Sequence, residues 1–251
     1  MIGFDDRGLL LGDGLFETIL AVDGAFDHLA AHLDRMAAGC VTLGLSELDL
    51  AEAERVAQAA LGRYPTGRVA IRLTLTAGSG GRGLDRPEQP RPVLFATGSP
   101  STKPLGAARL IISTLRRNAS SPVCRIKSLS YLENVLARRE AQLAGADEAV
   151  LLNHRGEIAC ASAANIFWWG DTTLKTPALS CGALAGIARS RVLAAARALG
   201  LATLEVCEPA DVLCRADLVF LTNSLIGLRQ AYFERCSDHP LVAILGEVFS
   251  A

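Results

Sequence analysis

Hydrophobic and polar residues along the chain follow two periods, one typical of β-strands and one typical of α-helices. Alternation rich in β-branched residues predicts a strand over 68–76, and the helical period of 29–39, with Leu33 and Met36 inward, predicts a helix. Asp23–Gly24 is a two-residue hairpin signal. The same criteria predict strands at 15–22, 93–97, 109–113, 148–152, 157–161, 164–169 and 218–222, helices at 50–61, 129–144 and 186–199, and a short strand and helix within 206–213.

These elements predict a mixed α/β fold of two domains, because strands and helices alternate without a simple repeat. Prolines and small residues over 98–104 are typical of a domain boundary. We therefore expect an N-terminal α/β domain at 1–104 and a C-terminal α/β domain at 105–251.

Composition narrows the class of protein. The chain has 251 residues, half of them hydrophobic, and a formal net charge of −1, which argues against a nucleic-acid partner. No apolar run reaches the ~18 residues of a membrane span, and the acidic start Met1–Arg7 is unlike a signal peptide. The seven cysteines form no CxxC pair, so we expect reduced thiols in a cytoplasmic protein, without a metal site or a membrane partner.

Lys127 lies where an extended segment gives way to a helix. Pro122 favours extended or turn backbone before it, and from Leu129 onward the apolar residues follow helical spacing. An amine nucleophile needs a partly desolvated lysine that can lose its proton, and a junction of this kind in a cleft can supply one. A surface lysine beside a capped helix is the alternative interpretation.

Three other features suit a small anion. Glycines precede the helix that starts at Gly186, whose first backbone N–H groups could bind a phosphate. Arg35, beside His32 on an early helix, could clamp a phosphate with two hydrogen bonds, and Thr222–Ser224 offers further donors after a buried strand. An ordinary helix start, a solvated arginine and a simple turn are the alternatives. No GxGxxG follows a strand and no Walker A motif is present, which argues against dinucleotide or ATP binding.

Taken in order, these stretches resemble the fold-type IV pyridoxal-phosphate enzymes, also called class IV aminotransferases. The resemblance covers nearly the whole chain. It rests on Asp6-Arg7-Gly8, on Gly12–Thr18, on His32–Met36, on Arg72-Leu73-Thr74 with the loop Gly78–Gly83, on Lys127–Asn134, on Asn165-Ile166-Phe167, on Thr176-Pro177 with Gly186–Arg189, and on Thr222–Gly227.

The resemblance implies a two-domain subunit that forms a homodimer and holds pyridoxal 5′-phosphate between its domains. Lys127 would bind the cofactor as an imine and then move protons. The cofactor phosphate and ring would be held by a set of residues from both halves of the chain: Arg35, Cys160, Ile187, Ala188, Asn223 and Ser224. Thr18, Arg82 and Arg229 are candidates for contacts with a substrate, and each arginine could equally be a plain surface residue.

The chain departs from the family pattern at Cys160. Family members usually carry a glutamate there, which pairs with the pyridine nitrogen of the cofactor. Glu157 is three residues away, and an odd offset on a strand points to the opposite face unless the strand bulges. A water, Ser162 or a distant carboxylate could replace the missing glutamate.

The loop Gly78–Gly83 and the run Thr222–Gly227 look most like the aminodeoxychorismate lyases, which release pyruvate and form 4-aminobenzoate for folate synthesis. Aromatisation drives that reaction, so it would tolerate the weaker electron sink that Cys160 implies. A D-amino-acid or branched-chain aminotransferase is the alternative within the family. A non-catalytic pyridoxal-phosphate-binding protein is the alternative outside enzymes. The sequence leaves the substrate and its stereochemistry open.

Overall fold

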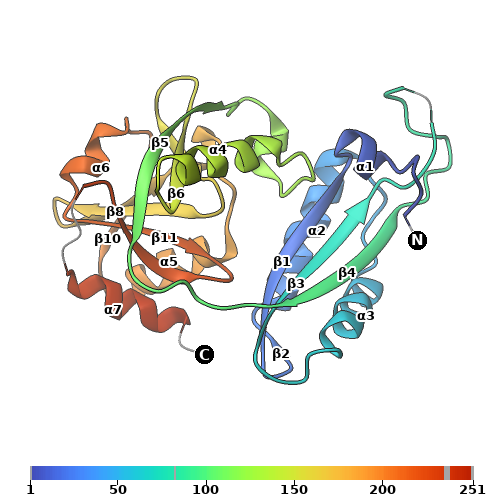
Figure 1. Cartoon of the computed structure of the whole chain (residues 1–251), viewed down its shortest axis with the longest axis horizontal. Helices are drawn as coiled ribbons and strands as arrows, with labels where there is room; N and C mark the ends of the chain where they lie inside the picture. The colour runs from blue at the N-terminus through green and yellow to red at the C-terminus, as the bar shows by residue number, and fades with distance from the viewer. Residues whose placement is uncertain (1, 82, 235–237, 250–251) are drawn as a thin grey trace. The chain divides into compact units, whose positions relative to one another are not determined.

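The computed structural model describes residues 2–81, 83–234 and 238–249, which form two compact units (Figure 1). Unit 1 consists of Met1–Thr102 together with Ile126–Tyr131, and unit 2 consists of Lys103–Arg125 together with Leu132–Ala251. The mixed α/β class expected from the hydrophobic pattern is confirmed in both units. The division into domains at 1–104 and 105–251 stays a prediction.

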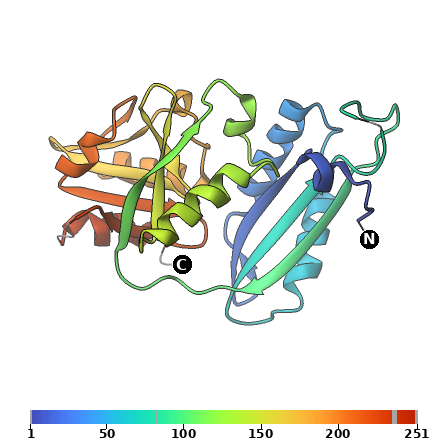
Figure 2. The same ribbon diagram turned by 45° about the horizontal axis from the view of Figure 1, so that its top comes forward.

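Unit 1 is an antiparallel sheet in the order β2-β1-β3-β4, with helices packed on one face (Figure 2). The hairpin expected at Asp23–Gly24 joins β1 to β2, and both residues have positive φ angles, as a tight hairpin turn requires. The elements of this unit are β1 (Gly14–Val22), β2 (Ala25–Phe26), β3 (Arg68–Thr76), β4 (Val93–Pro100), α1 (Arg7–Leu11), α2 (Leu29–Leu43) and α3 (Leu50–Leu61).

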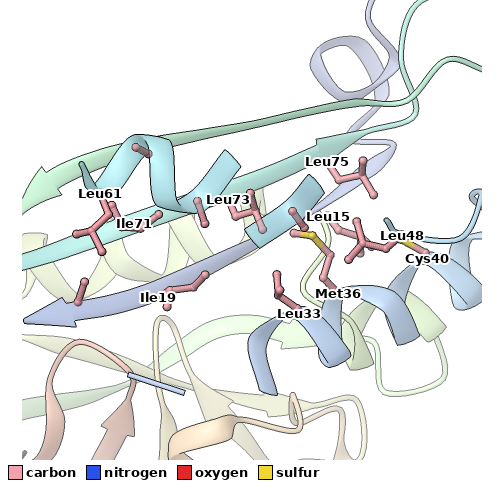
Figure 3. Packing of buried hydrophobic residues seen from close by; sticks show 14 of the residues in the cluster. Leu15, Ile19, Leu33, Met36, Cys40, Leu48, Leu61, Ile71, Leu73 and Leu75 are labelled. Carbon is pink, nitrogen blue, oxygen red and sulfur yellow. The ribbon is translucent and has the colours of Figure 1, made fainter. Parts of the chain in front are cut away.

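The core of unit 1 lies between this sheet and the helices α2 and α3. Leu15 and Ile19 are four residues apart on β1, and an even separation along a strand puts both side chains on the same face, toward α2. Figure 3 shows Leu15, Leu73 and Met36 gathered in the space between sheet and helix. Phe16 and Thr18 must therefore point away from the helices, toward the other face of the sheet.

Unit 2 contains an eight-stranded mixed sheet in the order β10-β9-β8-β11-β12-β5-β6-β7. Its strands are β5 (Ala108–Arg117), β6 (Glu148–Asn153), β7 (Ile158–Ala161), β8 (Asn165–Gly170), β9 (Thr173–Pro177), β10 (Ala202–Val206), β11 (Leu218–Asn223) and β12 (Gly227–Tyr232). Its helices are α4 (Leu132–Leu143), α5 (Ile187–Ala198), α6 (Asp211–Arg215) and α7 (Pro240–Gly246), with 3-10 turns η1 (Pro122–Arg125), η2 (Leu179–Cys181) and η3 (Glu247–Phe249).

Helix α5 packs on one face of this sheet, and its contacts define which residues share that face. Val192 and Leu193 of α5 lie against Phe167 of β8 and Phe220 of β11, whose rings stack with centroids 5.0 Å apart. Thr222 follows Phe220 at an even offset, so its side chain lies on the α5 side of β11.

Several sequence predictions need correction. Helix α4 begins at Leu132 and not at Leu129, because 127–129 pair with a strand instead. Pro122–Arg125 is a 3-10 turn, one of the two conformations expected there. Strands β9 and β12 and helix α7 were not predicted, since short segments give little periodicity to detect. No helix in the described part of the chain is both long and apolar enough to cross a membrane.

Candidate active site

The segment around Lys127 is held against strand β1 by backbone hydrogen bonds. The N–H of Phe16 donates to the carbonyl of Lys127, and the N–H of Leu129 donates to the carbonyl of Gly14. The distance from nitrogen to oxygen is 2.9 Å in both hydrogen bonds. Leu15 and Ser128 form the bridge between them. The sequence analysis assigned Lys127 to the C-terminal domain, whereas this pairing makes Ile126–Tyr131 part of unit 1.

Strand alternation fixes the direction of the Lys127 side chain. Ile126 joins the core of unit 1, so Lys127 points to the opposite face of the sheet, away from α2. Its Nζ lies 4.3 Å from the centre of the Phe16 ring and 3.5 Å from Oη of Tyr131. The two rings pack edge to face with centroids 5.0 Å apart. The amine is thus half-buried among aromatic groups, as the active-lysine interpretation requires.

Arg72 brings a second cation to this face. It is the register partner of Thr18, and its guanidinium lies 3.8 Å from the centre of the Phe16 ring. Burial lowers the pKa of Arg72, a shift that the phenol of Tyr131 opposes. Within the described residues no carboxylate forms an ion pair with Arg72. Lys127, Arg72 and the candidate Thr18 therefore share one face of the sheet of unit 1.

Arg35 lies on the other face, where α2 covers β1. Its Nε donates to Oε1 of Glu17 at 2.8 Å, and its Nη2 donates to Oε2 of Glu17 at 2.6 Å. His32, one turn earlier on α2, contacts the same carboxylate through Nδ1 at 2.7 Å. Glu17 is almost fully buried, with 1% of its side chain exposed. The sequence paired His32 with Arg35 correctly by spacing, but it did not identify Glu17 as the group that holds both.

The start of α5 has the features of an anion site. Its N-cap is Gly186, which supplies no side-chain hydrogen bond to the helix, so the first N–H groups at Ile187 and Ala188 are not capped by their own N-cap residue. A Cβ on Gly186 would overlap Oδ1 of Asn165, whose Nδ2 donates to the carbonyl of Leu184 over 2.9 Å. The loop before α5 is therefore packed closely against the beginning of β8.

Thr222 adjoins this helix start. It is the register partner of Asn165, and its Oγ1 is fully buried with no hydrogen-bond partner among the residues that the structure describes. Asn223 shapes the next turn: its Oδ1 accepts from the N–H groups of Leu225 and Ile226, and its Nδ2 donates to the carbonyl of Ala163. Ser224 lies within that turn. An orphaned hydroxyl beside an N-terminal helix turn fits a phosphate, so these residues of unit 2 fit the phosphate end of the cofactor.

Cys160 lies on β7, opposite Leu151, in an apolar cluster with Ala137 and Ala141 of α4. Burial raises the pKa of the Cys160 thiol; the charge of Arg117 opposes that shift and the charge of Glu148 adds to it. Cys160 is therefore a neutral thiol near pH 7, as the sequence analysis expected.

A buried arginine and a paired glutamate surround Cys160. Arg117 is buried, and its Nη1 donates to Oδ1 of Asn134 over 2.9 Å while its Nε has no partner. Glu148 accepts from the hydroxyl of Ser162 and forms an ion pair with Arg138 at 3.1 Å. Neither Arg117 nor Glu148 was identified from the sequence, because no short-range pattern links them to Cys160.

Strand β7 does bulge. Leu151 pairs with Cys160 and Leu152 with Ile158, so Ala159 is the extra residue, and the condition for Glu157 to change faces is met. The Glu157 carboxylate is nevertheless engaged elsewhere. Asn153 and Arg155 donate to its Oε2 over 2.7 Å each. Hydrogen bonds from these two residues lower the pKa of Glu157 to about 2.

The two arginine candidates for substrate binding gain no support. The guanidinium of Arg229 donates to the carbonyl of Gly106 over 3.0 Å and pairs with Asp147 at 3.2 Å, which accounts for it as a structural residue. Its substrate role stays a prediction. Arg82 lies outside the described residues.

Asp6 and Asp13, from the first two sequence motifs, stabilise the fold of unit 1. Asp6 caps α1 through the N–H of Gly8 and accepts from the hydroxyl of Thr76. Asp13 pairs with Arg7 at 3.0 Å and also with Arg86. These contacts join α1, the start of β1 and the loop before β4, so the motif positions the strand that carries Phe16.

Comparison with known proteins agrees with this geometry. The profile of the family described as amino-transferase class IV matches residues 14–231. A protein of Methanocaldococcus jannaschii, provisionally named a branched-chain-amino-acid aminotransferase, is 34% identical over 87% of this chain and 77% of its own. The aminodeoxychorismate lyase of Bacillus subtilis is 27% identical over 89% and 78%. The crystal structure of a protein of Legionella pneumophila, provisionally named a 4-amino-4-deoxychorismate lyase, matches with a TM-score of 0.91 at 28% identity, covering 100% of this chain and 94% of the other.

The chain therefore belongs to the class IV aminotransferase family. It has the fold-type IV architecture, and it is a pyridoxal-phosphate-dependent enzyme, a lyase or an aminotransferase acting on a small amine or amino acid. The resemblance inferred from the sequence motifs is confirmed at the level of family, fold and cofactor.

Glu17 makes the stability of the folded protein depend on pH. Burial by itself raises the pKa of Glu17, but hydrogen bonds from His32 and Arg35 and their charges hold it below its ordinary value of 4.5. A lowered pKa in the folded state stabilises the fold above pH 4.5, and this contribution is lost as pH falls through the folded pKa. At neutral pH, Glu17→Gln is expected to lower the free energy of unfolding by up to about 3 kcal/mol, because Arg35 loses its partner.

Urea unfolding of the cofactor-free protein from pH 7 down to pH 3 measures this effect. The difference between wild type and Glu17→Gln should shrink below pH 4.5. Glu54→Gln, on the exposed face of α3, is the matched control and should follow the wild-type curve. A constant difference across the whole range would contradict the assignment.

Proposed function

We propose that this enzyme is an aminodeoxychorismate lyase, which converts 4-amino-4-deoxychorismate to 4-aminobenzoate and pyruvate for folate synthesis. The observation that carries the proposal is the surroundings of Cys160. A neutral, buried thiol takes the place of the usual glutamate, and the largest charge effect on it comes from the cation Arg117. A ring nitrogen beside Cys160 would receive from this position no carboxylate to keep it protonated.

A weaker electron sink favours a reaction with its own driving force, and formation of an aromatic product supplies one. A transaminase must withdraw electrons through two half-reactions and depends more on a protonated ring. The names of the lyases among the relatives support the same choice. An aminotransferase is the second candidate, and it is favoured by the relative of 34% identity that carries that name.

We assign to Lys127 the covalent attachment of the cofactor and the proton transfers. Bound pyridoxal phosphate supplies an electron sink for bond cleavage next to the substrate amine. Nζ of Lys127 takes up and returns the proton, and Oη of Tyr131, 3.5 Å away, orients the amine. The ring of Phe16, whose centre lies 4.3 Å from Nζ, covers one side of the amine.

Arg72 is the best group to receive a substrate carboxylate. It lies beside Lys127 over the same aromatic ring, and within the described residues it has no ion-pair partner. A guanidinium can hold a carboxylate through two parallel hydrogen bonds. Thr18, its register partner, is a second contact on the same face. Aminodeoxychorismate carries two carboxylates, so a cation at this place suits the proposed substrate.

The first prediction concerns Lys127. Borohydride reduction of the holoenzyme should fix the cofactor on the peptide that contains Lys127. Lys127→Ala should abolish the formation of 4-aminobenzoate while the far-ultraviolet circular dichroism stays unchanged, because a half-buried side chain at a strand edge costs little stability. Peptide mass spectrometry and a fluorescence assay for 4-aminobenzoate provide the measurements. Label on Lys103 or Lys175 would overturn the assignment.

We further propose that the N-terminal turn of α5, with Thr222, Asn223 and Ser224, binds the cofactor phosphate. The uncapped helix start and the buried hydroxyl of Thr222 support this. Arg35, already anchored by Glu17, is assigned to the same phosphate as a supporting charge.

Thr222→Val tests the phosphate site, because valine keeps the shape of threonine and removes only the hydroxyl. Affinity for pyridoxal phosphate should fall by about 1.5–3 kcal/mol, the value of a hydrogen bond to a charged group. Stability of the cofactor-free protein should not fall, since the hydroxyl has no partner in the fold. Fluorescence titration and urea unfolding measure the two quantities. Thr173→Val is the control, because Thr173 begins β9 and pairs with Gly170, at the opposite end of β8 from Asn165. Equal affinities in the two variants would refute the site.

Cys160→Glu tests the choice between lyase and aminotransferase. A carboxylate at this position should keep the ring nitrogen protonated, and the ratio of transaminase to lyase rates should rise at least about tenfold, which corresponds to ~1.4 kcal/mol in activation free energy. Cys160→Ser, which adds no charge, is the matched control. The assays measure 4-aminobenzoate on one side and oxo-acid exchange with D- and L-alanine on the other. Fast transamination by the native protein, unchanged in Cys160→Glu, would refute the argument.

We also propose that the enzyme is a homodimer, with α4 in the interface. Leu132, Val135, Leu136 and Leu143 leave 68%, 59%, 41% and 79% of their surfaces exposed on one helix. An apolar surface of this kind on a soluble protein marks a protein contact. A cytoplasmic location, expected from the cysteine usage of the sequence, stays a prediction.

The dimer proposal predicts the effect of charge on α4. Val135→Glu combined with Leu136→Glu should convert the dimer to a monomer, because an interface core excludes unpaired charges. Light scattering after size exclusion measures the mass. Val41→Glu, at a residue of α2 that is 82% exposed, should leave the dimer intact. A native monomer, or a double variant that remains dimeric, would contradict the proposal.

A further inference from the structure

Two cysteines of unit 2 lie with their sulfur atoms in contact. Sγ of Cys181 and Sγ of Cys207 are 3.1 Å apart. Cys181 ends the turn η2, and Cys207 directly follows β10, whose parallel pairing with β9 sets Val206 opposite Pro177. Residues 26 positions apart in the chain are thus brought together by the sheet.

The two thiols differ in access. Cys181 is completely buried, whereas Cys207 is exposed to solvent. Burial, then the contact with Cys207 and the negative charge of Glu157, raise the pKa of Cys181 to about 12. Cys181 therefore stays protonated at neutral pH, and a reagent in solution meets Cys207 first.

A metal ion is a weaker explanation of the cluster. One ligand atom each from Glu157, Cys181 and Cys207 lies within 4.8 Å of the others. Oε2 of Glu157, however, already accepts hydrogen bonds from Asn153 and Arg155. The guanidinium of Arg155 also supplies the positive charge that a cation would bring. Asn153 and Arg155 account for Glu157, but they do not explain why the two sulfur atoms are in contact.

We propose that Cys181 and Cys207 form a reversible disulfide by exchange with a small-molecule disulfide such as oxidised glutathione. The Cys207 thiolate attacks one sulfur of glutathione disulfide, which forms a mixed disulfide and releases one glutathione thiolate. Cys181 then loses its proton to solvent, and its sulfur attacks Sγ of Cys207. The protein disulfide forms, the mixed disulfide breaks, and the second glutathione thiolate leaves. Two protein thiols are oxidised and one glutathione disulfide is reduced.

The disulfide would restrain the loop that leads to α5. Cys181 is followed by Gly182, whose φ of +93° favours glycine, and the chain then continues to the N-cap Gly186. Oxidation would tie this loop to the end of β10. The expected consequence, a changed rate of cofactor release, rests on the proposed phosphate site at α5, whereas the disulfide itself does not.

Incubation of the holoenzyme with oxidised glutathione, followed by alkylation and peptide mass spectrometry, tests the proposal. We expect a linked peptide pair containing Cys181 and Cys207, lighter by two hydrogens than the reduced pair and lost again with excess reduced glutathione. Cys207→Ser should abolish the link. Cys214→Ser removes another exposed cysteine and should leave the link unchanged.

Two results would overturn the proposal. One is equal glutathione modification of Cys207 and Cys214 with no Cys181–Cys207 link. The other is one equivalent of Zn²⁺, added alone to the cofactor-free protein, that binds in wild type but not in Cys207→Ser and blocks oxidation, which would make the cluster a metal site. Release of pyridoxal phosphate from oxidised and reduced enzyme is measured separately. A link without a change in release would contradict the phosphate site at α5 and not the disulfide.

Discussion

The structure of unit 1 depends on the pairing of a short segment, Ile126–Tyr131, with the edge of β1. Two backbone hydrogen bonds hold it there, and they decide the direction of every side chain in it. Ile126 enters the core, and Lys127 points to the opposite face, where Phe16, Arg72 and Tyr131 surround it. A register shift of one residue would exchange the two, because strand side chains alternate with a period of two.

The sheet of unit 1 thus separates two kinds of charge. On the helix side, Glu17 neutralises Arg35 in a buried pair that serves the fold as well as any ligand. On the other side, Lys127 and Arg72 are two cations beside one aromatic ring, and no carboxylate within the described residues pairs with Arg72. Arg72 is therefore the group on this face that we propose for a substrate carboxylate.

In unit 2 the polar groups differ in whether the fold itself supplies their partners. The N-cap of α5 supplies no side-chain hydrogen bond, and within the described part of the chain the buried hydroxyl of Thr222 has no partner, a combination that fits an anion. Around Cys160 the fold instead satisfies its charges internally, since Glu148 pairs with Arg138 and Glu157 with Arg155. Neither carboxylate is left to take the place of the usual glutamate, and this links the local packing to the choice of reaction.

The sequence by itself determined the family, the cofactor, the hairpin at Asp23–Gly24 and the start of α5, because these depend on local motifs and on periodicity within single elements. It also found the unusual Cys160. The role of Lys127 stays a prediction. Only the tertiary structure decided that Lys127 belongs to unit 1, that Glu17 pairs with Arg35, that Arg72 and Lys127 lie over the same Phe16 ring, and that Cys181 touches Cys207. Each of these is a contact across strands or between a strand and a helix, fixed by register and packing, and residue spacing along the chain carries no record of either.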